Sequence, residues 1–149
     1  MIIRGTIPMR FRPNVPSNLE NHIAINTIVD IEQREGVQLY LAMRAISQLM
    51  LQGVTAQGFA NVYFVDTDEF CLVQNDALNG GCFLPLVIFP LHRWRALRMT
   101  DLQMLTVMLE ELCHALFLIR DELAVKHMVT KAVQQLYPDL TIQKLYPGL

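Results

Sequence analysis

Glu110, Glu111 and His114 are the residues whose types and spacing could do chemistry in this sequence. His114 lies four residues after Glu110 and three after Glu111, so in a helix the three side chains would share one stripe. The surrounding segment, residues 101–119, reads DLQMLTVMLEELCHALFLI and is apolar almost all round, which predicts a helix buried on most sides. A carboxylate and an imidazole one turn apart can both reach a single divalent ion. A helix edge turned to water would explain the same stripe without any chemistry.

The other histidines and cysteines give weaker signals. Cys113 precedes His114, but neighbours on a helix point about 100° apart, so they form no nucleophile–base pair and we expect this cysteine in the core. His22 and His92 have no acidic or cysteine neighbour at ligand spacing. His127 could turn toward the stripe from a following helix or lie on the surface.

Two helices are expected to position the stripe. Thr100 is a suitable N-cap for the helix over 101–119. A second helix is predicted over 122–136, because Pro138 stops the pattern soon afterwards. The tail, residues 138–149, is predicted as coil on the surface.

Two further helices are expected in the N-terminal third. Ser17 stands three residues before Glu20, which is the spacing of a capping box, and predicts a helix over 18–33. Strong helix formers then fill residues 37–52, and Gly53 follows as a C-terminal cap.

Strands are expected between the two helix pairs. Runs of β-branched and aromatic residues predict strands over 59–65, 70–73 and 82–90. Asn79-Gly80 is a hairpin signal, and Pro85 confines the last strand to a sheet edge or a bulge. Residues 1–16 contain three prolines and predict an extended arm, with a short edge strand over 2–9.

This order of elements indicates an α+β fold. Strands that lie between helix pairs, without alternating with them, are typical of that class. We expect a small mixed or antiparallel sheet backed by helices. A chain of 149 residues fits one domain, which we place over 1–149.

The segment VMLEELCHALFLIRDELAV resembles the minimal gluzincin stretch of the zincin-like metallopeptidases. The zincin helix carries His-Glu-x-x-His, and residues 110–114 read Glu-Glu-x-x-His. The preceding NGGCFLPLVIFPLHRW resembles the edge strand along which a zincin lays its peptide by strand addition. The resemblance covers roughly residues 37–136 and implies a zincin-like fold.

The resemblance also implies residue roles. Glu111 takes the position of the general base, and His114 that of the second zinc ligand. Asp121 or Glu122 is the candidate third ligand, and Glu110 stands where the first zinc-binding histidine belongs. Such a carboxylate-rich set would lower the Lewis acidity of zinc and would suit manganese or iron better. The implied outcome is a zincin-like domain that has lost peptidase activity and holds either no cofactor or one divalent metal.

Composition excludes several classes. Twelve basic against fourteen acidic residues leave a net charge of −2, which argues against nucleic-acid binding. The apolar run over 82–91 is half the length of a membrane-spanning helix, and the first residues lack an apolar stretch, so we expect neither a membrane segment nor a signal peptide. Three widely spaced cysteines suit reduced thiols, so we expect a cytoplasmic protein. Apolar residues make up 52% and charged residues 17%, a surplus that suggests a hydrophobic groove or a homo-oligomer interface.

Three functions follow from these observations. The first is a degenerate zincin-like domain that binds a peptide or a protein. The second is a metal-dependent hydrolase, in which Glu110, His114 and Glu122 bind the metal and Glu111 takes a proton from water. The third is a structural or assembly protein with a hydrophobic interface.

Overall fold

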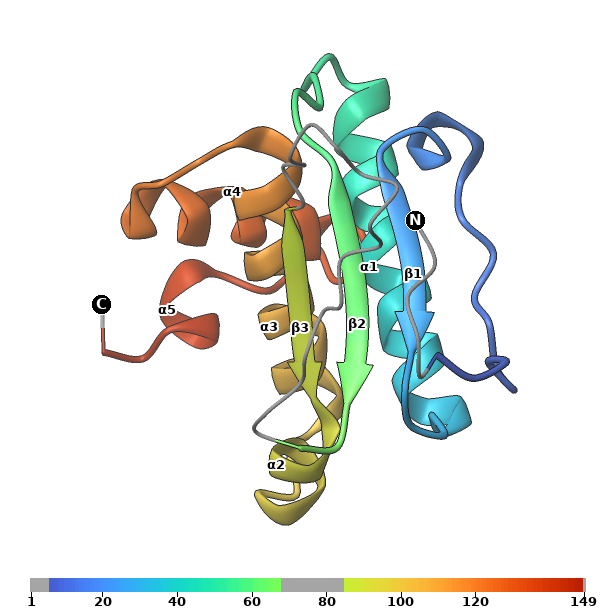
Figure 1. The fold of residues 1–149 in the computed structure, drawn as a ribbon. Helices are drawn as coiled ribbons and strands as arrows, with labels where there is room; N and C mark the ends of the chain where they lie inside the picture. The colour runs from blue at the N-terminus through green and yellow to red at the C-terminus, as the bar shows by residue number, and fades with distance from the viewer. Residues whose placement is uncertain (1–5, 68–84, 149) are drawn as a thin grey trace.

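A computed structural model describes residues 6–67 and 85–148 of the chain. The described residues form five α-helices, one 3-10 turn and a three-stranded sheet (Figure 1). In chain order the elements are η1 (Ser17–Leu19), β1 (Ile23–Thr27), α1 (Gln33–Leu51), β2 (Ala60–Val65), β3 (Leu86–Pro90), α2 (Leu91–Ala96), α3 (Asp101–Phe117), α4 (Glu122–Gln134) and α5 (Ile142–Leu145). The α+β class is confirmed.

The sheet has the order β1-β2-β3, and both pairings are parallel. The expected antiparallel pairing is therefore wrong for the described strands. Val62 of β2 lies opposite Ile25 of β1 and Val87 of β3, and all three are buried on one face. Helices α1 and α3 lie behind the strands and cover that face (Figure 1). Their apolar sides and the inner residues of the strands make one continuous core.

The predicted helix over 18–33 is wrong. The Ser17–Glu20 spacing closes only the single 3-10 turn of η1, in which the Glu20 amide donates to the Ser17 carbonyl at 3.4 Å. The next residues, IAINT, form β1, whose side chains alternate between buried and half-buried. β-branched residues with a two-residue period favour a strand over a helix.

The second predicted N-terminal helix is confirmed, but α1 begins four residues earlier than expected. Glu32 and Glu35 form a reciprocal capping box at its start. Gly36 lies inside the first turn, where a side chain would meet the Phe11 carbonyl oxygen at 2.8 Å. At the other end Gly53 has φ +98°, so the predicted glycine cap is confirmed.

The predicted strand over 59–65 is confirmed as β2, and the end of the strand over 82–90 as β3. Pro85 precedes β3, so it removes no ladder donor, and its carbonyl accepts the Asn61 amide at 3.0 Å. β3 is an edge strand of the described sheet, as expected. The predicted strand over 70–73, the Asn79-Gly80 turn and residues 82–84 lie outside the described residues.

The N-terminal arm is extended where it is described. Residues 6–9 contain no strand, so the predicted edge strand over 2–9 is wrong for that part, and residues 2–5 lie outside the described residues. The Ile7 amide nevertheless donates to the Thr27 carbonyl at 2.9 Å. The arm is therefore tied to the outer side of β1.

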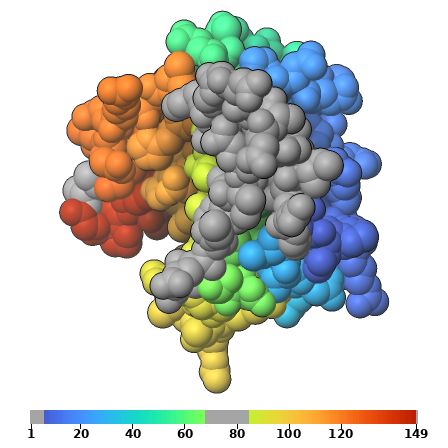
Figure 2. Space-filling view, in the orientation of Figure 1, coloured from blue at the N-terminus to red at the C-terminus, as the bar shows by residue number. Residues whose placement is uncertain are grey.

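Both predicted C-terminal helices are confirmed as α3 and α4, each two residues shorter than expected. The tail holds the short helix α5, so the expectation of coil throughout is wrong. In the space-filling view the C-terminal elements form one flank of the molecule and the N-terminal segment the other (Figure 2). No single described helix is long and apolar enough to cross a bilayer. Helices α3 and α4 together have the required length and apolar composition, but they are bent by 113° relative to each other.

Candidate functional site

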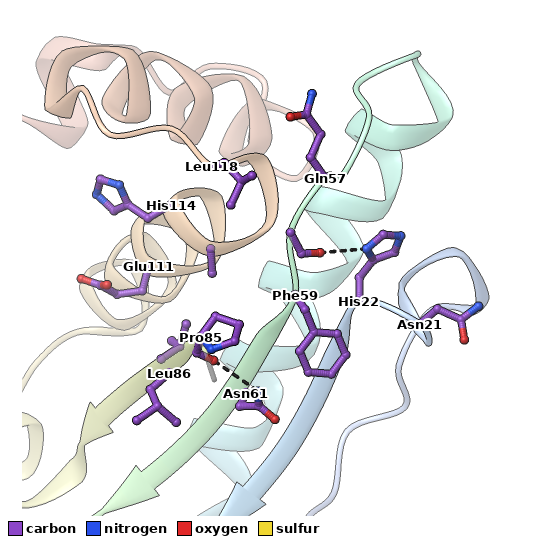
Figure 3. A pocket seen from close by; sticks show the side chains of 13 residues that line it. Asn21, His22, Gln57, Phe59, Asn61, Pro85, Leu86, Glu111, His114 and Leu118 are labelled. Atoms are coloured by element: carbon purple, nitrogen blue, oxygen red, sulfur yellow. Dashed lines mark hydrogen bonds between the residues drawn. The ribbon is translucent and has the colours of Figure 1, made fainter. Parts of the chain in front are cut away.

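A pocket of about 920 Å³ lies between the amino ends of the three strands and the C-terminal half of α3. Its walls combine apolar side chains with two histidines, one glutamate and several side-chain amides. The lining residues are Asn21, His22, Gln57, Gly58, Phe59, Asn61, Pro85, Leu86, Val87, Glu111, His114, Ala115 and Leu118. Glu111 and His114 leave the same side of α3, and His22 lies at the opposite end of the pocket beside β1 (Figure 3).

The end of α3 is fixed to the pocket wall by its backbone. The Leu116 carbonyl accepts two amides from the segment before β2, Gln57 at 2.8 Å and Gly58 at 2.9 Å. A Cβ atom at Gly58 would lie 1.9 Å from the Ala115 carbonyl oxygen, so only glycine permits this approach. Leu118 then ends the helix in the left-handed conformation, with φ +54° and ψ +31°.

This helix end also orients His114. Nδ1 of His114 lies 2.6 Å from the Ile119 carbonyl oxygen. Because a carbonyl oxygen only accepts, Nδ1 carries the proton, and Nε2 is the nitrogen left to meet a ligand. The Glu122 Oε1 atom lies 3.6 Å from Nε2.

Glu111 is the acidic residue that lines this end of the pocket. Loss of water around its carboxyl group raises the pKa above the ordinary 4.5. Glu110 and Glu122 raise the pKa further by repulsion, while His114 lowers it. The side chain as a whole remains exposed, so the carboxyl group is accessible from the pocket.

The three residues of the predicted stripe do not all reach the pocket. Glu111 and His114 line the pocket, but Glu110 does not. Glu110 lies beside the buried hydroxyl of Tyr146, whose pKa is raised first by burial and then by this carboxylate. The Tyr146 hydroxyl and the Glu110 carboxylate are close, but they do not form a hydrogen bond of ordinary geometry. Lys126 places its Nζ atom 5.4 Å from the centre of the Tyr146 ring, so the tail is packed against α4 at this point.

The choice left open between Asp121 and Glu122 has a structural answer. Asp121 is the N-cap of α4, and its Oδ1 atom accepts the Ala124 amide at 2.7 Å. Glu122 is the residue that faces His114. Within residues 6–67 and 85–148, no three His, Cys, Asp or Glu side chains converge closely enough to hold a metal ion.

Two weaker predictions can also be placed. Cys113 is fully buried in the core as expected, and burial raises the pKa of its thiol to about 12. His127 is exposed and does not line the pocket, which supports the surface alternative.

Of the lining residues, sequence reasoning assigned only Glu111 and His114 to a site, and three of the others show why the rest were missed. His22 donates from Nδ1 to the Gly58 carbonyl at 2.9 Å, Asn61 donates to the Pro85 carbonyl at 3.3 Å, and Leu86 faces the cavity wall (Figure 3). Each reaches the site only through the pairing of the parallel strands. No local spacing could have indicated them. No protein-family model, curated protein or solved structure matches the chain.

Proposed function

We propose that the chain is a zincin-like domain without peptidase activity, and that its pocket binds an extended peptide segment. The observation that supports this best is the position of the pocket. It lies where the start of β3 meets the half of α3 that holds Glu111 and His114. A volume of about 920 Å³ is that of a ligand site, and the walls are mainly apolar with a few convergent polar groups.

The strand beside the pocket suits a peptide. β3 pairs with β2 on one side, and no described strand pairs with its other side. Leu86 and Ile88 project from β3 with 37% and 38% exposure, while Val87 and Phe89, which alternate with them, are buried. Main-chain hydrogen bonds at such an edge give affinity, and the alternate apolar side chains give specificity.

The charges of the pocket favour a basic segment. Glu111 lines it and Glu122 lies beside His114, while no lysine or arginine is among the described lining residues. A lysine or arginine of the bound segment would meet both carboxylates. The occupant we propose is therefore an extended segment with apolar side chains and a basic one.

The position of Glu110 favours binding over cleavage. In the zincin resemblance this residue stands at the first zinc ligand. Here its carboxylate lies beside Tyr146, outside the lining of the pocket. Glu111 and His114 remain at the pocket wall and would hold a peptide by charge and hydrogen bonding.

Affinity selection from a pool of random hexapeptides tests this proposal. Immobilised protein should enrich a subset of the pool, identified by mass spectrometry. Leu86→Lys places a cation in the pocket wall and should abolish the enrichment. Leu97→Lys is the matched control, because Leu97 is 74% exposed and lies outside the pocket. Equal enrichment by wild type and Leu86→Lys, or none by either, would contradict peptide binding at this site.

A metal-dependent hydrolase is the second candidate, favoured by the orientation of His114. A metal-binding histidine commonly donates its other ring nitrogen to a carbonyl, as His114 does to Ile119. His114 and Glu122 could share an ion, whereas Glu110 would have to leave Tyr146. Glu111, with its raised pKa, is suited to accept a proton.

Metal content decides between the two candidates. Elemental mass spectrometry of protein purified without chelator should find no stoichiometric zinc, manganese or iron if the pocket only binds peptide. For the hydrolase, metal should be present in wild type and in His127→Ala, and absent in His114→Ala. His127 is a fair control because it is an exposed histidine outside the pocket.

A further inference from the structure

We infer that Leu118 is a specificity-determining residue of the pocket, where it recognises an aliphatic side chain of the bound segment. This inference rests on the proposed peptide binding. It adds the identity of the residue that selects the occupant and the class of side chain selected.

The backbone of Leu118 is the first observation. Its φ of +54° lies in the left-handed region, where a side chain is disfavoured and helices usually end with glycine or asparagine. Glycine at this position would end α3 equally well. Termination of the helix therefore does not explain a leucine.

The surroundings of its side chain do not explain the leucine either. Leu118 is 57% exposed and is not part of the described core. Its Cδ2 atom approaches the backbone at Gly58, where a Cβ atom would lie 3.0 Å away, and the rest of the side chain faces solvent at the pocket. The left-handed backbone is unfavourable for a leucine in the free protein, and a ligand that covered the exposed side chain would add favourable apolar burial.

The position of Leu118 is fixed by the chain around it. The two amides bound to the Leu116 carbonyl hold the helix end against the segment before β2. Leu118 and Leu86 both line the pocket, one from the end of α3 and the other from β3. An aliphatic side chain of a ligand beside Leu118 would cover this leucine and remove its apolar surface from water. The carboxylate of Glu111 lines the same pocket, so the preferred segment combines an aliphatic residue with a basic one.

The other described non-glycine residue at positive φ provides a comparison. Arg98 has φ +50° and follows α2, away from this pocket. Its side chain is polar and exposed, so it adds no apolar surface. The combination of strain and exposed apolar surface is found at Leu118, within the pocket.

The experiment uses a hexapeptide library in which one position at a time is fixed. Wild-type protein should prefer Leu, Ile, Val or Met at one position and Lys or Arg at another. Leu118→Gly should reduce the aliphatic preference by about tenfold, because one desolvated apolar contact is lost, and should leave the basic preference intact. Its midpoint of thermal unfolding should stay equal to that of wild type or rise, because glycine relieves the strain.

Two further variants complete the test. Leu118→Asn tolerates the left-handed backbone and should lose the aliphatic preference as Leu118→Gly does, which guards against a folding defect of the glycine variant. Arg98→Gly should keep both preferences. An aliphatic preference that survives in Leu118→Gly and Leu118→Asn would overturn the inference while peptide binding stands. A library without any preference in wild type would instead overturn the proposed function.

Discussion

His114 and Glu111 are neighbours on one helix, yet the structure gives them different constraints. His114 is held through Nδ1 by the Ile119 carbonyl, so its ring cannot turn without breaking a bond at a helix end. Glu111 has no such anchor among the described contacts, and repulsion from Glu110 and Glu122 acts on its charge. A carboxylate in these surroundings is unfavourable in the free protein. It becomes favourable when a cation of a ligand lies beside it.

The pKa of Glu111 leads to a prediction at this scale. Folding raises the pKa of Glu111 above 4.5, so the folded state binds a proton more tightly than the unfolded state. The stability that this residue contributes is therefore present below the unfolded pKa and is lost as the pH rises through the folded pKa. Glu111→Gln should therefore be more stable than wild type at pH 7, and the difference should vanish below about pH 4. Urea unfolding at both pH values measures it.

Glu20→Gln is the control for this measurement, because Glu20 is an exposed glutamate remote from α3. It should show no such pH-dependent gain. A Glu111→Gln variant that is less stable than wild type at pH 7 would mean that the carboxylate is satisfied within the free protein.

At the scale of elements, the contact between the end of α3 and the start of β2 builds the pocket. It depends on Gly58, since any side chain there collides with the Ala115 carbonyl. The collision is with backbone, so it cannot be relieved by a rotamer change. The helix and the segment before the strand must separate instead, and the two hydrogen bonds to Leu116 would be lost with them.

Gly58→Ala should therefore lower the free energy of unfolding by about 2 kcal/mol or more, from overpacking and lost hydrogen bonds. Gly53→Ala is the matched comparison. Gly53 has φ +98°, but a Cβ atom there would meet no other atom within 4 Å, so only backbone strain applies and about 1 kcal/mol is expected. Urea unfolding of both variants gives the two values. Equal losses would show that the close approach at Gly58 contributes little.

The elements also show which features a sequence can predict. Helices α1, α3 and α4 were predictable because they are long and periodic. The segment that forms β1 was misread because Ile23, Thr27 and Ile31 are four residues apart, a spacing that fits both a helical period and a two-residue period. Tertiary pairing with β2 decides between the two, and no local pattern contains that information.

The same distinction applies to the site. Glu111 and His114 could be predicted together because one helix holds both. Glu110 belongs to the same stripe, but its carboxylate lies beside Tyr146 of the distant tail and outside the lining of the pocket. His22 and Leu86 could not be predicted, because only the order of the parallel strands brings them to α3.

At the scale of the whole molecule, ion pairs connect helices at the end opposite to the pocket, where the starts of α1 and α3 meet α2. Arg95 of α2 forms a two-pronged pair with Glu35 of α1, with both N–O distances at 2.8 Å, and also donates to the Asp30 carbonyl. The Glu35 side chain is only 4% exposed. Arg34 pairs with Asp101 and donates to the Met99 carbonyl at 2.7 Å. The two arginines thus join α1 to α2 and α3, two helices that come much later in the chain.

Arg95→Leu should lower the free energy of unfolding by about 2 kcal/mol, because the buried Glu35 carboxylate loses its cation and keeps the Glu32 amide as a donor. Arg34→Leu should cost less than about 1 kcal/mol, because both partners of that pair are well exposed. Urea unfolding at neutral pH measures both. A larger loss for Arg34→Leu would assign the main role to the exposed pair.

The parallel strand order has a consequence for how the site is acquired during folding. The lining residues extend from Asn21 to Leu118, in four short stretches that lie far apart in the chain. Contacts of such long sequence separation form late, and no fragment that ends before α3 contains the pocket. A nascent or truncated chain would therefore be unable to bind, and binding should disappear over the same range of denaturant concentration as the global fold.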